Sequence, residues 1–297
     1  MTDIRELEKR YNQLERKTSF TEDEAIEYVE VLSALIEQTH NYVYAEDLGG
    51  YYYGLKDYDL ALKYYELAVS YGSHWANNGL GYIWYYGRTG QVDYEKAFNC
   101  FSYVLNDPQA DINWQIEAAF KIADMYRNGY YVEKDYDQYV AIIEDLYKQV
   151  SDNDLFSKPE VYSRLASIRK KQGRNEEALE LLYDTRYYLS QRLSRNNFFG
   201  DLNRMKWAVN DIYALEEFDP TEFDLYDLYY LLKEPHVVSF LYDGERHEVE
   251  ARQDEEINIR FDDKWYRNID AFFQNASIDG QSIEALKWFL DDWRIEE

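Results

Sequence analysis

A recurring spacing of small residues constrains the fold of this chain more than any other feature of its sequence. Gly49 is followed at offsets of 12, 16 and 19 residues by Ala61, Tyr65 and Ala68. The same three offsets from Ala166 lead to Ala178, Leu182 and Thr185. Spacing that recurs this far along a chain is typical of an array of stacked helical repeats.

Two longer copies of the pattern lie between these short ones. They start at Gly81 and Ala123, and in both the offsets are 16, 20 and 23 residues. The residues reached are Ala97, Phe101 and Val104 in one copy and Tyr139, Ile143 and Leu146 in the other. Each offset exceeds the short form by four residues, which predicts a four-residue insertion in the turn between two helices, where extra length costs little loop-closure entropy.

Close helix crossings explain why small residues recur. Two antiparallel helices approach closely only where neither carries a bulky side chain, so we expect contacts of Gly49 with Ala61, Gly81 with Ala97 and Ala166 with Ala178. Aromatic residues nearby would fill the wedge between successive pairs. The glycines of residues 79–90 lack the G-x-G-x-x-G spacing, a preceding strand and the Lys-Ser/Thr of a phosphate-binding loop. Helix packing is therefore preferred over nucleotide binding.

The short copies resemble tetratricopeptide repeats, and the long copies resemble the related Sel-one-like repeat. The latter has the pattern A-x-x-L-G-x-x-Y-x-x-G, a turn containing Asp, and a second helix rich in Ala and aromatic residues. Residues 43–185 carry the resemblance, about half of the chain. It implies a mainly α fold, a right-handed α/α solenoid of helix pairs, and a role in protein–protein interaction.

Helical patterns also flank the repeats. Residues 3–17 and 21–39 are predicted to form two helices that together cap the solenoid over residues 3–39. Thr21 and Glu24 form a capping box at the start of the second helix. After the repeats, helical spacing over 201–218 and a helix from Pro220 to about Lys233 predict a degenerate last pair over 198–233. We therefore expect a solenoid domain spanning residues 1–233.

The period changes after Pro235, which predicts a small α+β module over residues 234–297. An apolar run and an alternating run meet at Asp243-Gly244, a signal for a two-residue β-hairpin, and residues 257–261 form a possible third strand. Residues 268–276 and 282–293 read as two helices capped by Asn268 and Ser282. The end of this module resembles C-terminal tails of bacterial proteins of unassigned function.

Composition and charge limit the possible partners. The net charge of −26 has the wrong sign for a nucleic-acid ligand. It serves solubility and would also steer a basic partner toward the protein. The module over 234–297 holds 17 acidic and 7 basic residues, a net charge of −10. The first residues are charged rather than typical of a signal sequence, and no apolar run reaches membrane-spanning length, so we expect a cytoplasmic protein with no membrane or nucleic-acid partner.

No group of residues suggests catalysis, a metal site or a cofactor. The four histidines are scattered, whereas a closed metal site needs three or four convergent ligands. Cys100 lies in a predicted second helix and is assigned to the core. The many carboxylates show no spacing that singles out an acid and a base. The sequence therefore predicts no enzyme and no bound cofactor.

The concave face of the stacked first helices is the predicted binding surface. Positions one, four and five residues after each small residue, and three and six before it, should be exposed there. The partner-binding residues selected in this way are Glu46, Tyr53, Trp75, Asn78, Tyr82, Tyr85, Tyr86, Asp124, Arg127, Asn128, Lys170 and Lys171, with Glu117 as a further position. The alternative for each aromatic residue is packing against a neighbouring repeat.

Three functional hypotheses follow. The first is a non-enzymatic adaptor that binds a peptide or protein on the concave face. The second is an acidic immunity or inhibitor protein that neutralises a basic effector such as a nuclease toxin, since opposite charge accelerates encounter. The third, a hydrolase using carboxylates of the C-terminal module, has the least support, because no pair of them stands out.

Overall fold

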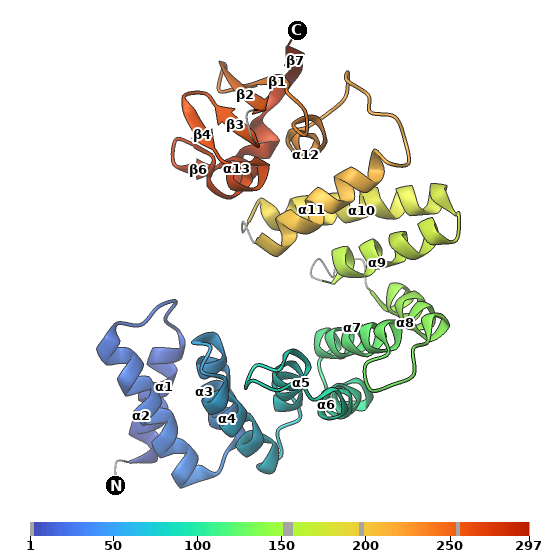
Figure 1. The fold of residues 1–297 in the computed structure, drawn as a ribbon. Helices are drawn as coiled ribbons and strands as arrows, with labels where there is room; N and C mark the ends of the chain where they lie inside the picture. Colours follow the sequence, from blue (N-terminus) through green and yellow to red (C-terminus); the bar gives the residue numbers. More distant parts are fainter. Residues whose placement is uncertain (1–2, 151–156, 196–198, 254–255, 297) are drawn as a thin grey trace. The chain divides into compact units, whose positions relative to one another are not determined.

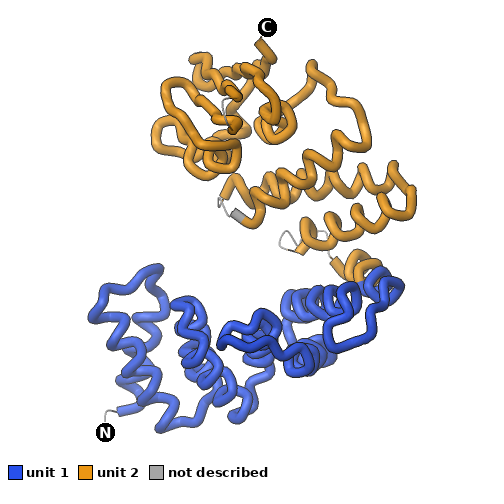
Figure 2. Tube along the Cα trace, viewed as in Figure 1, with its two compact units in different colours: residues 1–142 blue, residues 143–297 orange. Residues whose placement is uncertain are grey.

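The computed structural model describes residues 3–150, 157–195, 199–253 and 256–296. The chain divides into two compact units, residues 1–142 and residues 143–297 (Figure 2). In the described residues of the first unit, here called unit 1, every secondary-structure element is a helix. The second, unit 2, combines helices with an antiparallel sheet.

Unit 1 consists of consecutive helix pairs, coloured blue to green in Figure 1. Its helices are α1 (Ile4–Glu15), α2 (Glu22–Thr39), α3 (Tyr42–Gly54), α4 (Tyr58–Ser70), α5 (Ala76–Tyr86), α6 (Tyr94–Asn106) and α7 (Ile112–Asn128), while α8 (Tyr136–Gln149) spans the boundary at residue 142. The expected capping box is present, because the Thr21 side chain accepts from the Glu24 N–H and the Glu24 side chain accepts from the Thr21 N–H. One apolar cluster runs from Leu7 in α1 to Ile83 in α5.

The turns within the helix pairs confirm the predicted insertion. The short copies join their helices through three residues, 55–57 between α3 and α4 and 172–174 between α9 (Lys158–Lys171) and α10 (Asn175–Leu193). The long copies use seven, 87–93 and 129–135. Both long turns close in the same way, with Asp93 N–H donating to Trp84 O at 3.1 Å and Asp135 N–H donating to Tyr126 O at 2.9 Å.

The glycines of the repeats make room for aromatic rings. A Cβ added to Gly49 would lie 2.6 Å from the Tyr65 ring, and one added to Gly81 would lie 2.6 Å from the Phe101 ring. Gly79 contacts the other side of the Tyr65 ring, where a Cβ would lie 2.5 Å from a ring carbon. In each case the atoms nearest to the added Cβ belong to an aromatic residue of a second helix. The expected partners Ala61 and Ala97 are fully buried, and their contacts with Gly49 and Gly81 stay a prediction.

After the end of α8, unit 2 contains the fourth repeat, α9 and α10, followed by α11 (Phe199–Ile212). The predicted helix from Pro220 to Lys233 is wrong in extent, since only η1 (Leu225–Asp227) and α12 (Leu228–Leu231) are helical. Asp219 Oδ1 accepts from the Thr221 N–H and hydroxyl, a local turn that competes with a helix start at this point. Asp224 then forms the capping box that opens η1.

The C-terminal part folds into a five-stranded antiparallel sheet of order β4-β3-β2-β1-β7. Its strands are β1 (Val237–Tyr242), β2 (Glu245–Gln253), β3 (Ile257–Phe261), β4 (Lys264–Tyr266) and β7 (Asp291–Glu296), and β5 (Ser277–Ile278) pairs separately with β6 (Gln281–Ser282). The hairpin at Asp243-Gly244 is confirmed: both residues have positive φ, and Tyr242 pairs with Glu245. The third strand and the caps at Asn268, for α13 (Ile269–Asn275), and at Ser282 are confirmed as well.

The predicted helix over 282–293 is wrong in its second half. Only α14 (Ile283–Leu286) and η2 (Lys287–Phe289) are helical, and β7 follows. β7 pairs with the edge of β1, Val238 opposite Ile295. Trp293 and Ile295 pack on the apolar core in this arrangement, so long-range strand pairing overrides the local helical pattern.

One apolar core joins the last helices to this sheet. It contains Leu189 of α10, Met205 of α11, Tyr229 of α12, Phe240 of β1 and Phe272 of α13. The expected domain boundary between residues 233 and 234 therefore lies inside unit 2 and inside its core.

Candidate interaction surface

Side chains on successive first helices of unit 1 reach one another. Tyr11 of α1 donates to Asp47 of α3 at 2.5 Å, and Ser73, just before α5, donates to Glu46 of α3. Tyr82 of α5 lies 3.4 Å from Glu117 of α7, its hydroxyl donating to Oε2. These contacts join residues of neighbouring first helices. We call the side of unit 1 on which α1, α3, α5 and α7 make these contacts the first-helix face.

The predicted tyrosines of α5 come together around a lysine of α7. Lys121 Nζ lies 5.2, 4.9 and 4.8 Å from the ring centres of Tyr82, Tyr85 and Tyr86, and it donates to the Tyr86 hydroxyl at 2.7 Å. Arg88 also lies over the Tyr86 ring, with its guanidinium carbon 4.9 Å from the ring centre. We call Tyr82, Tyr85, Tyr86, Lys121 and Arg88 the tyrosine patch. Tyr86 is its most accessible tyrosine, 46% exposed.

The tyrosine patch extends to the first repeat through Arg88. The guanidinium also lies 5.3 Å from the ring centre of Tyr58, against which Tyr53 packs edge-on. Burial raises the pKa values of Tyr53, Tyr82 and Tyr85. The charge of Glu117 adds to the increase at Tyr82, and the charge of Asp124 adds to the increase at Tyr85. These hydroxyls therefore remain protonated hydrogen-bond donors at neutral pH.

The remaining predicted residues of unit 1 serve partly structural roles. Asn78 is 3% exposed, so its predicted exposure is wrong; its Nδ2 donates to Glu117 at 3.4 Å. A side chain of α7 thus contacts this position of α5, so Asn78 is not free on a surface. At the end of α7, Arg127 lies 5.5 Å from the Tyr139 ring centre, and Asn128 donates to the Asp124 carbonyl at 2.7 Å.

Lys170 and Lys171 belong to unit 2. Lys170 Nζ donates to Asp211 Oδ1 at 2.8 Å, which links α9 to α11. Their participation in one surface with the residues of unit 1 stays a prediction.

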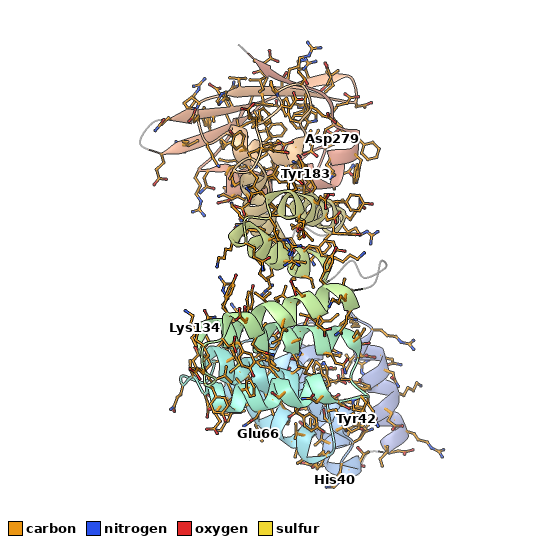
Figure 3. The ribbon with its side chains drawn as sticks, turned by 90° about the vertical axis from the view of Figure 1, so that its right-hand side faces the viewer. His40, Tyr42, Glu66, Lys134, Tyr183 and Asp279 are labelled. Carbon is orange, nitrogen blue, oxygen red and sulfur yellow. The ribbon has the colours of Figure 1, made fainter. Side chains whose placement is uncertain are left out.

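A pocket of about 440 Å³ opens where the first helices of unit 1 begin. Its lining residues are Tyr42, Val43, Glu46, His74, Trp75, Val104, Gln109, Ala110, Asp111 and Trp114. Trp75 and Trp114 meet edge-on, with ring centres 5.3 Å apart. Tyr42, which Figure 3 shows at the start of α3, is 41% exposed. We call this the aromatic pocket.

Two acidic groups lie in the aromatic pocket. Burial raises the pKa of the Glu46 carboxyl, the Ser73 hydroxyl opposes this by donating to it, and the charge of Asp47 adds to the increase. Asp111 caps α7 by accepting from the Asn113 N–H at 2.8 Å. His74 is held by the buried Asp107, with Nδ1 and Oδ2 2.6 Å apart. The pocket therefore combines aromatic walls with negative charge.

Comparison with known proteins returns likenesses of fold. The sequence matches no protein-family model, and it matches no curated protein. Among solved structures, the type IV pilus biogenesis factor PilW is 17% identical, with a TM-score of 0.45 over 72% of this chain and 91% of PilW. The c5321 protective antigen of uropathogenic Escherichia coli, which displays an SLR fold, is 19% identical, with a TM-score of 0.39 over 64% of this chain and 44% of c5321.

The turn lengths and the glycine–aromatic contacts of this chain's own helix pairs decide its architecture. The described helices of its repeats form successive pairs joined by turns of three or seven residues, the arrangement that the resemblance to tetratricopeptide and Sel-one-like repeats implies. A C-terminal antiparallel sheet follows these repeats. None of the helices in the described residues is long and apolar enough to cross a membrane.

The offset rule for repeats missed several residues of this surface. Lys121 lies two positions before Ala123, and Arg88 lies in a turn, so neither position falls under the rule. Tyr42 and Trp114 lie seven and nine positions before the small residues of their repeats, which is one and three positions beyond the reach of the rule. Aromatic residues in the first turn of successive first helices are the signal that would have found the aromatic pocket.

Cys100 packs against the apolar cluster of unit 1, as expected. Burial raises the pKa of its thiol to about 11, which keeps it protonated and a poor nucleophile at neutral pH.

Proposed function

We propose that this protein is a non-enzymatic adaptor that binds a peptide or protein partner on the first-helix face of unit 1. The observation that supports this most directly is the concentration of tyrosine and tryptophan there, in the tyrosine patch and the aromatic pocket. Such side chains bury large areas at a small cost in conformational entropy and are enriched at the centres of interfaces.

The charged groups of this face support an adaptor more than an enzyme. Lys121 lies over aromatic rings, Glu117 accepts from Tyr82 and Asn78, and Asp111 caps a helix. These contacts orient side chains and stabilise the packing of helices, and they do not converge on one point where a reacting atom could lie.

A capture experiment with the full chain tests the proposal. We expect the double variant Tyr82→Ala, Tyr86→Ala to lose partners that the parent chain captures, because it removes the exposed Tyr86 ring and the half-buried Tyr82 ring stacked on it. The matched control is Tyr183→Ala, Tyr187→Ala on α10, where both tyrosines are also exposed. Circular dichroism establishes that each variant is folded. If the double variant is unstable, Tyr86→Ala alone serves in its place. Retention of every partner would contradict the proposal.

The immunity or inhibitor hypothesis remains the alternative, and the net charge of −26 favours it. Within the C-terminal sheet, however, several carboxylates are paired with arginines: Glu250 with Arg252 and Arg260, and Asp292 with Arg246 and Arg294. This pairing reduces the negative charge that the module offers to a basic effector.

A further inference from the structure

The aromatic pocket has the chemistry of a site for a positively charged group. We propose that it binds a lysine or arginine side chain carried by an extended peptide segment of the partner. The inference rests on the proposed function and specifies what the partner presents to this part of the first-helix face.

The walls of the pocket are suited to a cation. Trp75, Trp114 and Tyr42 line it, and the edge-on contact of the two tryptophans orients the ring of one at about 76° to the ring of the other. The faces of aromatic rings attract ammonium and guanidinium groups, tryptophan most strongly. A volume of about 440 Å³ lies in the range of sites that enclose a small ligand, so a long side chain and part of its backbone fit.

The carboxylate of Glu46 supplies the complementary charge. It is partly buried, and its hydrogen-bond donor is the neutral hydroxyl of Ser73. Within the described residues, neither Glu46 nor Asp111 forms an ion pair with a lysine or arginine. A cation from outside the chain would therefore neutralise charge that the protein itself leaves unpaired, which favours binding of that cation.

The aromatic rings of the tyrosine patch differ from those of the pocket in being covered by basic side chains. There, Lys121 and Arg88 cover the rings of Tyr82, Tyr85 and Tyr86. In the part of the chain that the structure describes, no lysine or arginine covers the rings of Tyr42, Trp75 or Trp114. The only basic side chain of the pocket lining, His74, is paired with Asp107, so it does not oppose an incoming cation.

Short peptides test this inference on the full chain. Acetyl-Gly-Lys-Gly-amide and its arginine equivalent are titrated into ¹⁵N-labelled protein, and the indole N–H signals of Trp75 and Trp114 are followed by NMR. Acetyl-Gly-norleucine-Gly-amide and acetyl-Gly-Glu-Gly-amide provide the neutral and acidic comparisons. We expect the lysine and arginine peptides to shift both indole signals and the other two to leave them unchanged.

Two variants locate the charge that matters. Glu46→Gln should weaken binding of the lysine peptide about tenfold, because it removes the carboxylate charge that would pair with the lysine and keeps the size and shape of the side chain. Glu66→Gln, the same change at an exposed position on α4, should leave binding unchanged (Figure 3). The inference is overturned if the norleucine or acidic peptide binds as well as the lysine peptide, if no peptide shifts the indole signals, or if Glu46→Gln has no effect.

The outcomes separate this inference from the proposed function. Loss of captured partners in the Tyr82→Ala, Tyr86→Ala variant without any response to the lysine peptide would leave the adaptor function in place and refute the cation site. Lysine binding in the pocket together with full partner capture by that variant would support the cation site and contradict the proposed role of the tyrosine patch.

Discussion

Glu284 shows how far the environment of one residue can differ from what its sequence position suggests. It follows the cap Ser282 and the apolar Ile283, where a helix-opening glutamate is normally exposed. In the structure it is fully buried, with no lysine or arginine paired to it among the described residues. Burial raises the pKa of this carboxyl to about 7.

This buried carboxyl predicts a pH-dependent stability. The folded chain holds the proton of Glu284 more tightly than the unfolded chain, whose carboxyl has a pKa of 4.5. The free energy of unfolding should therefore fall as the pH rises from 4.5 to about 7, by at most ~1.4 kcal/mol per pH unit from this group, and then level off. Glu284→Gln removes the ionisable group, so we expect it to raise the melting temperature at pH 7.5 relative to the parent chain and to bring no such gain at pH 4.5.

Thermal unfolding of both chains at the two pH values checks this prediction. Glu245→Gln, an exposed glutamate on β2, is the matched control and should shift the melting temperature little at either pH. An equal gain for Glu284→Gln at pH 4.5 and pH 7.5 would show that the carboxyl is ionised at no cost in the folded chain.

At the scale of elements, the packing of α3, α4 and α5 depends on one ring held between two glycines. Tyr65 of α4 is 4% exposed and contacts Gly49 of α3 on one side and Gly79 of α5 on the other. The ring cannot move away from either helix without entering the other. Sequence spacing predicts that small residues lie at these crossings, but not that one tyrosine fills both contacts.

Alanine substitutions at neighbouring glycines should therefore have opposite effects. Gly79→Ala places a methyl group 2.5 Å from the Tyr65 ring and should destabilise the chain by ~1–3 kcal/mol. Gly50→Ala meets only the Tyr65 hydroxyl at 3.8 Å, within helix α3, and should stabilise by ~0.5–1 kcal/mol because alanine favours the helix. The urea midpoints of the full chains measure both effects. A neutral Gly79→Ala would mean that Tyr65 has room to shift.

At the scale of the whole molecule, the net charge of −26 bears on how a partner is found. Long-range attraction accelerates encounter with a basic partner, whereas aromatic contacts determine how long the complex lasts. A lysine or arginine bound in the aromatic pocket would take part in both.

Salt separates these contributions for any basic partner recovered by capture. Raising the salt concentration from about 0.15 M to 1 M shortens the Debye length from about 8 Å to 3 Å. We expect the association rate constant to fall about tenfold or more and the dissociation rate constant to change much less, measured by surface plasmon resonance. An association rate independent of salt would argue against electrostatic steering and would dispose of the immunity or inhibitor hypothesis in particular.

The sequence by itself determined the features that depend on neighbours along the chain. These are the helix pairs, the four-residue difference between short and long turns, the capping box at Thr21 and the hairpin at Asp243-Gly244. Each arises from hydrogen bonds or backbone preferences within a few residues, so a local pattern suffices to predict it. The gathering of Tyr82, Tyr85 and Tyr86 on one face also follows from helical spacing.

Only the tertiary structure decided the features that depend on distant residues. Residues 291–296 form β7 because the edge of β1 is there to pair with them, although the pattern over 282–293 predicts a helix that would include the first three of them. Lys121 joins the tyrosines, and Trp114 meets Trp75, because α7 packs beside α5. Burial and strand pairing are set by the surroundings that the rest of the chain supplies, and those surroundings exist only once the chain has folded.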